Sequence, residues 1–161
     1  SQRVLENNNK SFNIDYAKQI IKEVKQIGFR VRTSFIFDLP TTKKEDMQKT
    51  IEFILETEPD EIRGHFLSLR LGTTIFNNLS KKDELPTQYI HSDKPLLENS
   101  EYTNKELLND VDYLIKKLED RNYKIVRDVK DWENVEFLRN KEGKIKFLSF
   151  CPSRYGIDWE K

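Results

Sequence analysis

Two segments of this sequence carry the residue types that perform acid–base and binding chemistry. Asp38 lies near the end of the apolar segment 29–39, and His65 lies in the next apolar segment, 61–71. A carboxylate at a strand end can accept hydrogen bonds from a ligand, and an imidazole titrates near neutral pH, so it can move a proton or hold a carboxylate. Arg63 lies two residues before His65. We therefore predict a substrate pocket that contains His65 and Arg63.

Each of these residues also has a structural interpretation. An Asp ahead of a turn often accepts hydrogen bonds from nearby backbone N–H groups, and Asp38 precedes Pro40. A lone, partly buried His is common, and the sequence fixes no second His or carboxylate beside His65. The sequence has a single cysteine, Cys151, and a lone cysteine is more often buried and inert than reactive. No Ser-His-Asp, Walker, Gly-rich dinucleotide or zinc pattern is present, so both interpretations stay open.

The elements that must position these residues begin with a helix and a strand. Residues 13–27 have apolar side chains at helical spacing, with Asn13 as N-cap and Gly28 just past the end. Segment 29–39 predicts a strand, because it is rich in Phe, Val, Ile and Thr. Its alternation gives one polar side, formed by Arg32, Ser34 and Asp38.

A second helix and a second strand follow. Thr42 and Glu45 have the spacing of a capping box, and the helix that they begin ends before Pro59. Segment 61–71 is the next strand. A strand–helix–strand sequence with short connections predicts parallel pairing and a right-handed crossover.

Parallel strands present their carboxyl ends together, which predicts the place of a ligand site. We expect Asp38, His65 and Arg70 to converge at that end of the sheet. His65 should lie deepest, because it comes several residues before the predicted end of its strand.

The second half of the chain predicts a loop, a helix and a small antiparallel piece. Residues 81–101 lack periodicity and predict a loop or lid. Thr103 and Glu106 form a second capping box at the start of a helix. Residues 123–127 predict a short strand.

An antiparallel hairpin is predicted at the end. Segments 135–139 and 144–150 flank residues 140–143, which suggests two paired strands with Gly143 at a positive φ angle. The predicted fold class is therefore α/β: a partial (βα) barrel fragment with parallel strands, followed by a helix and a small antiparallel β hairpin. The predicted parts are the βα units, the loop or lid, and the extension, at 1–80, 81–101 and 102–161.

Composition limits the partners. The chain has 161 residues, with 28 Lys and Arg against 28 Asp and Glu, so net charge gives no argument for nucleic acid or an anionic membrane. No apolar run reaches the roughly 20 residues of a membrane span, and no signal peptide is visible, so we expect a cytoplasmic protein. One cysteine excludes an internal disulfide and a cluster site built from this chain's cysteines alone.

Three stretches in about the first half of the chain resemble the radical S-adenosylmethionine (radical SAM) superfamily. They are Ser-Gln-Arg-Val-Leu at the start, Phe-Ile-Phe-Asp-Leu-Pro at 35–40, and Leu-Gly-Thr-Thr-Ile-Phe at 71–76. In that family similar stretches accompany the fourth, fifth and sixth barrel strands. The resemblance implies the C-terminal half of a partial barrel, with the cluster-binding N-terminal half and its Cys-x-x-x-Cys-x-x-Cys loop absent. We therefore expect a chain cut from a longer protein.

The resemblance also implies cofactors and binding residues. The full-length protein would hold S-adenosylmethionine and a 4Fe-4S cluster, and this chain alone is expected to retain neither. The implied cofactor-binding positions are Asn9, Lys10, Ile36, Phe37, Asp38, Ser68 and Arg70; no metal ligand is implied. The family favours Gly where Asp38 and Thr41 stand, which sets this sequence apart at a point of close backbone approach.

The sequence therefore supports two functional hypotheses. In the first, the chain is the C-terminal portion of a radical SAM enzyme, contributes part of the S-adenosylmethionine and substrate pocket for an unknown substrate, and is inactive alone. In the second, it is a non-catalytic α/β binding or structural module without a cluster. The expected partners are the missing N-terminal half of the barrel and a second copy, because the strand at 29–39 would have an open edge.

Overall fold

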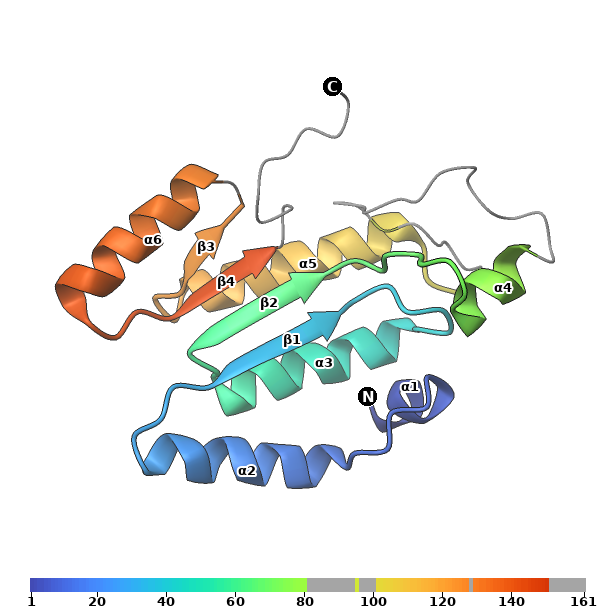
Figure 1. Ribbon diagram of the computed structural model, residues 1–161, viewed down its shortest axis with the longest axis horizontal. Coiled ribbons are helices and arrows are strands. Elements are labelled where there is room, and N and C mark those ends of the chain that lie inside the picture. Colours follow the sequence, from blue (N-terminus) through green and yellow to red (C-terminus); the bar gives the residue numbers. More distant parts are fainter. Residues whose placement is uncertain (81–94, 96–100, 128, 151–161) are drawn as a thin grey trace.

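The computed structural model describes residues 1–80, 95, 101–127 and 129–150 (Figure 1). Its strands form one all-parallel sheet in the order β1-β2-β4-β3. In chain order the elements are α1 (Gln2–Asn7), α2 (Ile14–Gln26), β1 (Arg32–Ile36), α3 (Lys44–Thr57), β2 (Glu61–His65), α4 (Thr74–Ser80), α5 (Asn104–Glu119), β3 (Lys124–Val126), α6 (Val129–Glu142) and β4 (Phe147–Phe150). The predicted α/β class with parallel strands is confirmed.

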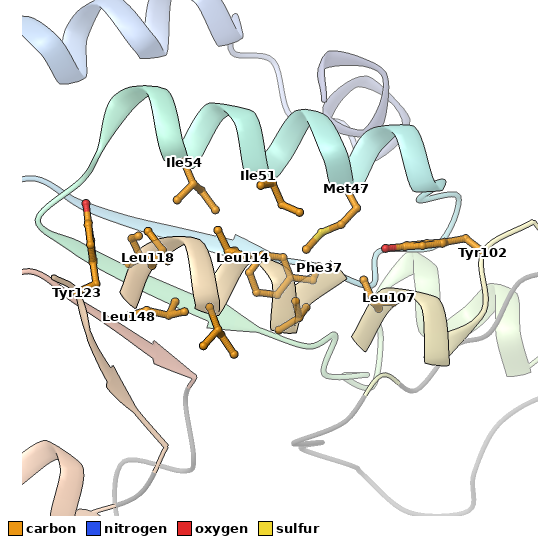
Figure 2. Packing of buried hydrophobic residues seen from close by; sticks show 13 residues of the cluster. Phe37, Met47, Ile51, Ile54, Tyr102, Leu107, Leu114, Leu118, Tyr123 and Leu148 are labelled. Atoms are coloured by element: carbon orange, nitrogen blue, oxygen red, sulfur yellow. The ribbon is translucent and has the colours of Figure 1, made fainter. Parts of the chain in front are cut away.

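Helices α3 and α5 cover one face of the sheet and form the main core with it. Ile62 of β2 and Leu148 of β4 are fully buried there, against Ile54 of α3 and Leu114 of α5. Figure 2 shows Ile54, Leu114 and Leu148 meeting between the two helices and the strands. Because side chains alternate along a strand, the neighbours of Ile62 and Leu148 lie on the other face.

Helix α6 covers part of that other face. Val135 of α6 packs with Val126 of β3 and Phe147 of β4 in a second, smaller core. The connection from β3 to β4 runs back across the sheet, so a right-handed crossover requires a helix on the face opposite to α3 and α5. The β1 and β2 part of this face keeps exposed side chains.

The helix starts follow the predicted caps closely. The Asn13 side chain accepts a hydrogen bond from the Tyr16 N–H at the start of α2. Thr103 and Glu106 form the predicted reciprocal capping box of α5. The cap of α3 differs by one residue, because Asp46 bonds back to the Lys43 N–H, so Lys43 takes the N-cap position instead of Thr42.

The two predicted N-terminal strands are present and shorter than expected. β1 pairs in parallel with β2, and Ile36 lies opposite His65. Strand β2 ends at His65 rather than at residue 71, so His65 lies at the carboxyl end and Arg63 lies deeper. Of Asp38, His65 and Arg70, His65 is still the deepest, because the other two follow the ends of β1 and β2, but it lies at the end of its strand rather than several residues before it.

The predicted C-terminal hairpin is wrong. Residues 129–142 form α6, and β4 pairs in parallel with both β2 and β3. The local pattern Val-Glu-Phe-Leu-Arg at 135–139 alternates like a strand, but β4 gains two strand partners and complete burial of Leu148 only when the chain crosses back over the sheet. Gly143 does have a positive φ angle, of 79°, just after the helix.

Strand order also departs from sequence order after β2. A barrel places consecutive strands side by side, whereas here β4 lies between β2 and β3. Most of the predicted loop at 81–101 and all of the residues from Cys151 onward lie outside the described residues.

Candidate functional site

The part of the sheet that no described helix covers carries polar side chains in register. We call it the open face, and it consists of Arg32, Ser34, Ile36, Arg63, His65 and Ser149. Arg32 and Ser34 are exposed, Arg63 and His65 are half-buried, and Ser149 is buried. The predicted polar side of β1 is thus present, and β2 and β4 extend it.

Asp38 joins the exits of β1 and β2. Its buried carboxylate accepts a hydrogen bond from the Leu67 N–H, and the Phe37 N–H donates to the His65 carbonyl at 3.0 Å. These two bonds hold the chain after β1 against the chain after β2. The structural interpretation of Asp38, a carboxylate that satisfies nearby backbone N–H groups, therefore describes one role that it has.

His65 and Arg63 both point to the open face, away from α3 and α5. Ile62 and Gly64, which alternate with them, face the helices: Ile62 is fully buried, and a Cβ on Gly64 would lie 2.7 Å from the Phe37 ring. His65 lies opposite Ile36 on β1. Arg63 and His65 are each engaged by a neighbouring group in this structure.

At the amino end of the open face, a buried carboxylate is neutralised by arginines. Glu61 is 5% exposed, and its carboxylate lies 2.6 Å from Arg32 Nε and 3.8 Å from Arg30 Nη2. Arg30 Nη2 also donates to the Ile145 carbonyl, whereas its Nε and Nη1 are buried and have no hydrogen-bond partner among the described residues. The two arginines therefore compensate the charge of this buried carboxylate.

Helix α1 stabilises the loop between β1 and α3. Arg3 donates to the Thr41 carbonyl at 2.7 Å and pairs with the Asp46 carboxylate. Burial opposes ionisation of Asp46, but the hydrogen bonds it accepts, with that from Arg3 first, outweigh it and lower its pKa from 3.8. Thr41 has a positive φ of 76°, a conformation that favours Gly, so this turn places a β-branched residue in a left-handed backbone conformation.

The remaining implied cofactor-binding residues lie around this end of the sheet in different environments. Asn9 and Lys10 are exposed in the turn after α1, which contacts Thr41 through Asn7. Ser68 is half-buried after β2, and Arg70 is exposed, with its carbonyl accepting from Thr73 at the turn into α4. His65 is the last residue of β2, Arg70 follows β2, and Asp38 follows β1, so all three lie at or beyond the carboxyl ends of these strands.

Ile36 and Phe37 differ in what they offer a ligand. Ile36 is 46% exposed on the open face, whereas Phe37 is 2% exposed in the main core, where Figure 2 shows it among Met47 and Leu107. The Phe37 N–H is already bonded to His65. Of the two implied positions, Ile36 therefore has a side chain that a ligand can contact, and Phe37 does not.

A 4Fe-4S cluster does not fit this chain by itself, because the cluster needs at least three thiolates and the sequence has one cysteine. In the part of the chain that the structure describes, no group of three or more His, Cys, Asp or Glu side chains could hold a metal ion. No described helix is both long enough and apolar enough to cross a membrane.

Ser149 is the open-face residue that sequence reasoning missed. Ser149 lies in the Phe-Leu-Ser-Phe run of β4, and its Cα pairs with that of Arg63. A polar residue within an apolar run was the available signal, but the strand partner of that run could not be read from local pattern.

Comparisons of the chain with protein-family models, with curated proteins and with solved structures gave no match.

Proposed function

We propose that this chain is the C-terminal portion of a radical SAM iron–sulfur enzyme and supplies part of the pocket for S-adenosylmethionine and substrate. Two lines of support meet here: the sequence stretches that resemble the family, and the open face of β1 and β2. Polar side chains on an uncovered sheet face, beside the carboxyl ends of parallel strands, suit the interior wall of a partial barrel. That open face is the observation that carries the proposal.

The open edge of β1 supports a partner beside it. β1 is the terminal strand of the described sheet and pairs only with β2. An unpaired edge presents backbone N–H and C=O groups that can bind another strand. In the proposed enzyme this strand belongs to the cluster-binding half of the barrel.

Helix α2, which precedes β1, and the residue that caps its C-terminus carry exposed apolar side chains that a partner could cover. Tyr16, Ile20 and Ile27 are 62%, 37% and 72% exposed and form what we call the α2 strip. Lys18 and Lys22, on the opposite flank of the helix, pair with Glu56 of α3. At 100° per residue the α2 strip therefore faces away from α3.

In this proposal the chain's own residues bind and orient, and the cluster comes from another segment. S-adenosylmethionine, when bound and reduced by one electron from that cluster, would supply a 5′-deoxyadenosyl radical and release methionine. Ile36 provides apolar contact, and Arg63 and His65 hold the substrate on the open face. The pairing of Asp38 with the Leu67 N–H keeps the two strand exits at a fixed separation. The proposal places the protein in the cytoplasm, where a single cysteine stays reduced.

The experiment uses the longest natural reading frame that contains this sequence. The protein is purified and reconstituted without oxygen, and 5′-deoxyadenosine is measured after reduction with dithionite in the presence of S-adenosylmethionine. We expect 5′-deoxyadenosine from the longer protein and none from this chain alone. A reading frame without a Cys-x-x-x-Cys-x-x-Cys loop, or a reconstituted protein that forms no 5′-deoxyadenosine, would overturn the proposal.

One observation favours the alternative, a non-catalytic α/β binding module. Asp38 stands where the resembled family favours Gly, and its carboxylate is engaged by the Leu67 N–H at the point where backbone would approach a cofactor. For a module, equilibrium dialysis of the longer protein should detect no S-adenosylmethionine, whereas the enzyme should retain it at micromolar concentration.

A further inference from the structure

The turn between β1 and α3 has a backbone conformation that its sequence does not favour. The Thr42 N–H donates to the Leu39 carbonyl at 3.0 Å, and Thr41 has a φ of 76°. Because the ring of Pro40 fixes a negative φ at the position before Thr41, this is a type II turn, whose third residue is normally Gly or Asn. Thr41 is β-branched, so its backbone is strained in this turn.

The same four residues can also close a type I turn. Both turn types keep a negative φ at Pro40 and the hydrogen bond from residue 42 to residue 39, and they differ in the orientation of the peptide between Pro40 and Thr41. In the type I turn Thr41 would have an ordinary negative φ. The intrinsic preference of Thr therefore favours type I, and the observed type II turn needs contacts that offset the strain.

Helix α1 supplies such contacts. Arg3 donates to the Thr41 carbonyl at 2.7 Å and also pairs with the Asp46 carboxylate. The Asn7 side-chain amide donates to the Thr41 hydroxyl at 3.5 Å, and Val4, between Arg3 and Asn7, is buried. α1 therefore contacts both the backbone and the side chain of the strained residue.

The peptide that differs between the two turn types is not fixed by a hydrogen bond. In the part of the chain that the structure describes, neither the Pro40 carbonyl nor the Thr41 N–H has a hydrogen-bond partner, and Thr41 is exposed. This peptide can therefore reverse its orientation while the bond between residues 39 and 42 stays intact.

We propose that the turn at 39–42 is a conformational switch, in which the Pro40–Thr41 peptide flips between the type II and type I orientations and α1 holds it in type II. The flip exchanges a carbonyl for an N–H beyond the carboxyl end of β1. A ligand that bonds to either group shifts the equilibrium, and the contacts of α1 with Thr41 shift with it. This inference goes beyond the proposed enzyme and does not depend on it.

The test is NMR of the ¹⁵N- and ¹³C-labelled 161-residue chain. The type II orientation brings the Pro40 Hα close to the Thr41 amide proton, and the type I orientation moves it away, so the nuclear Overhauser effect between them identifies the major turn type. Relaxation dispersion at the amide of residue 41 measures the minor one. We expect type II as the major form of the native chain, and a type I major form would overturn the proposal.

Matched variants test the part that α1 plays. Arg3→Gln should lower the ratio of type II to type I about tenfold, because a hydrogen bond from a charged group is lost. Arg121→Gln removes a charge that pairs with Glu58 at the C-terminal end of α3, and it should leave the ratio unchanged. An unchanged ratio in Arg3→Gln, or equal changes in the two variants, would contradict the role of α1.

Thr41→Gly tests the cause of the equilibrium. Gly accepts a positive φ, so the turn of Thr41→Gly should stay in type II, and adding Arg3→Gln should change its ratio less than about twofold. A tenfold change in the Gly background as well would mean that α1 does not offset the strain of Thr41, and the proposal would fail.

Asn7→Ala keeps the test decisive if Arg3→Gln fails to fold. It changes an exposed residue and should lower the ratio of type II to type I about threefold through one lost hydrogen bond. If Asn7→Ala left both the nuclear Overhauser effect and the relaxation dispersion of residue 41 as in the native chain, the hold of α1 on the turn would be refuted.

Discussion

At the scale of single residues, Asp38 has two possible roles, to bind a ligand or to stabilise the fold. A ligand site needs an accessible carboxylate, but Asp38 is 4% exposed and satisfies a backbone N–H from the neighbouring strand exit. The buried N–H of Leu67 would lose its acceptor if Asp38 were removed. The structural role of Asp38 is therefore to hold together the two chain segments that follow β1 and β2.

We predict that Asp38→Ala destabilises the chain by about 1–3 kcal/mol, the cost of leaving a buried donor without a partner. Asp38→Asn should cost less, because its amide oxygen can still accept from Leu67. Urea unfolding followed by circular dichroism measures both. If Ala and Asn were equally mild, the Leu67 bond would contribute little to stability.

A second prediction at this scale concerns pH and Asp46. The pKa of its carboxyl is lowered from 3.8, because the hydrogen bonds from Arg3 and its other donors outweigh the effect of burial. A depressed folded pKa stabilises the fold fully above 3.8, and this contribution is lost as the pH falls through the folded value. Asp46→Asn should therefore lower the unfolding free energy by about 1 kcal/mol at pH 6.

The difference between the native chain and Asp46→Asn should shrink as the pH falls below 3.8. Urea titrations at several pH values measure it. Asp112→Asn, on the exposed side of α5, serves as the control, and its difference should stay near zero throughout. A constant Asp46→Asn difference from pH 6 to pH 2.5 would count against the assigned ion pair with Arg3.

At the scale of elements, the sequence predicts those features that depend on residues close together in the chain. Asn13 and the pair Thr103 and Glu106 cap their helices as predicted, because a cap depends only on residues within one turn. The β1–α3–β2 unit was likewise predictable, since short connections leave one topology. Helix α6 was missed because its described residues include a single buried apolar side chain, Val135, so helical periodicity is weak.

The candidate site was predictable in part for the same reason. Arg63 and His65 lie on β2 and Asp38 follows β1, and the sequence identifies both strands, so their common end followed from parallel pairing. Ser149 could not be assigned, because its place beside Arg63 depends on a crossover from β3 back to β4. Long-range strand order is decided by burial of whole strands, and no local pattern records it.

An element-scale prediction follows from the close packing at the centre of β2. A Cβ on Gly64 would lie 2.7 Å from the Phe37 ring and 2.9 Å from the Phe150 ring, on the face that meets the helices. Gly64→Ala should therefore destabilise the chain by about 1–3 kcal/mol through overpacking. Thermal unfolding measures the loss.

A double variant tests the cause of that loss. Phe37→Leu should relieve part of the clash, so Gly64→Ala should cost less in the Phe37→Leu background than alone. Simple additivity of the two changes would mean that the loss comes from the backbone of β2 rather than from the contact with Phe37.

At the scale of the whole molecule, the described sheet is asymmetric. α6 packs on one face of β3 and β4, whereas the same face of β1 and β2 has no described helix over it, and α2 packs beside α3 (Figure 1). β1 is a terminal strand of the described sheet, and α2, which precedes it in the chain, carries exposed apolar side chains. Exposed strand edges next to apolar surface tend to recruit further strands. The same surface that would receive another part of a barrel can therefore receive a second copy.

We predict that the isolated chain self-associates at micromolar concentration through the β1 edge and the α2 strip. Sedimentation velocity should show dimers or larger species.

Ile27→Lys should shift the population toward monomer, because the side chain is 72% exposed and a charge there costs little in the monomer but much in a dry interface. Tyr113→Lys makes the same kind of change at a side chain that is 51% exposed on α5, away from the edge, and should leave the association unchanged. A monomer at every concentration, or equal effects of the two variants, would show that the edge of β1 recruits no strand, and a partner beside β1 would then need contacts other than the α2 strip.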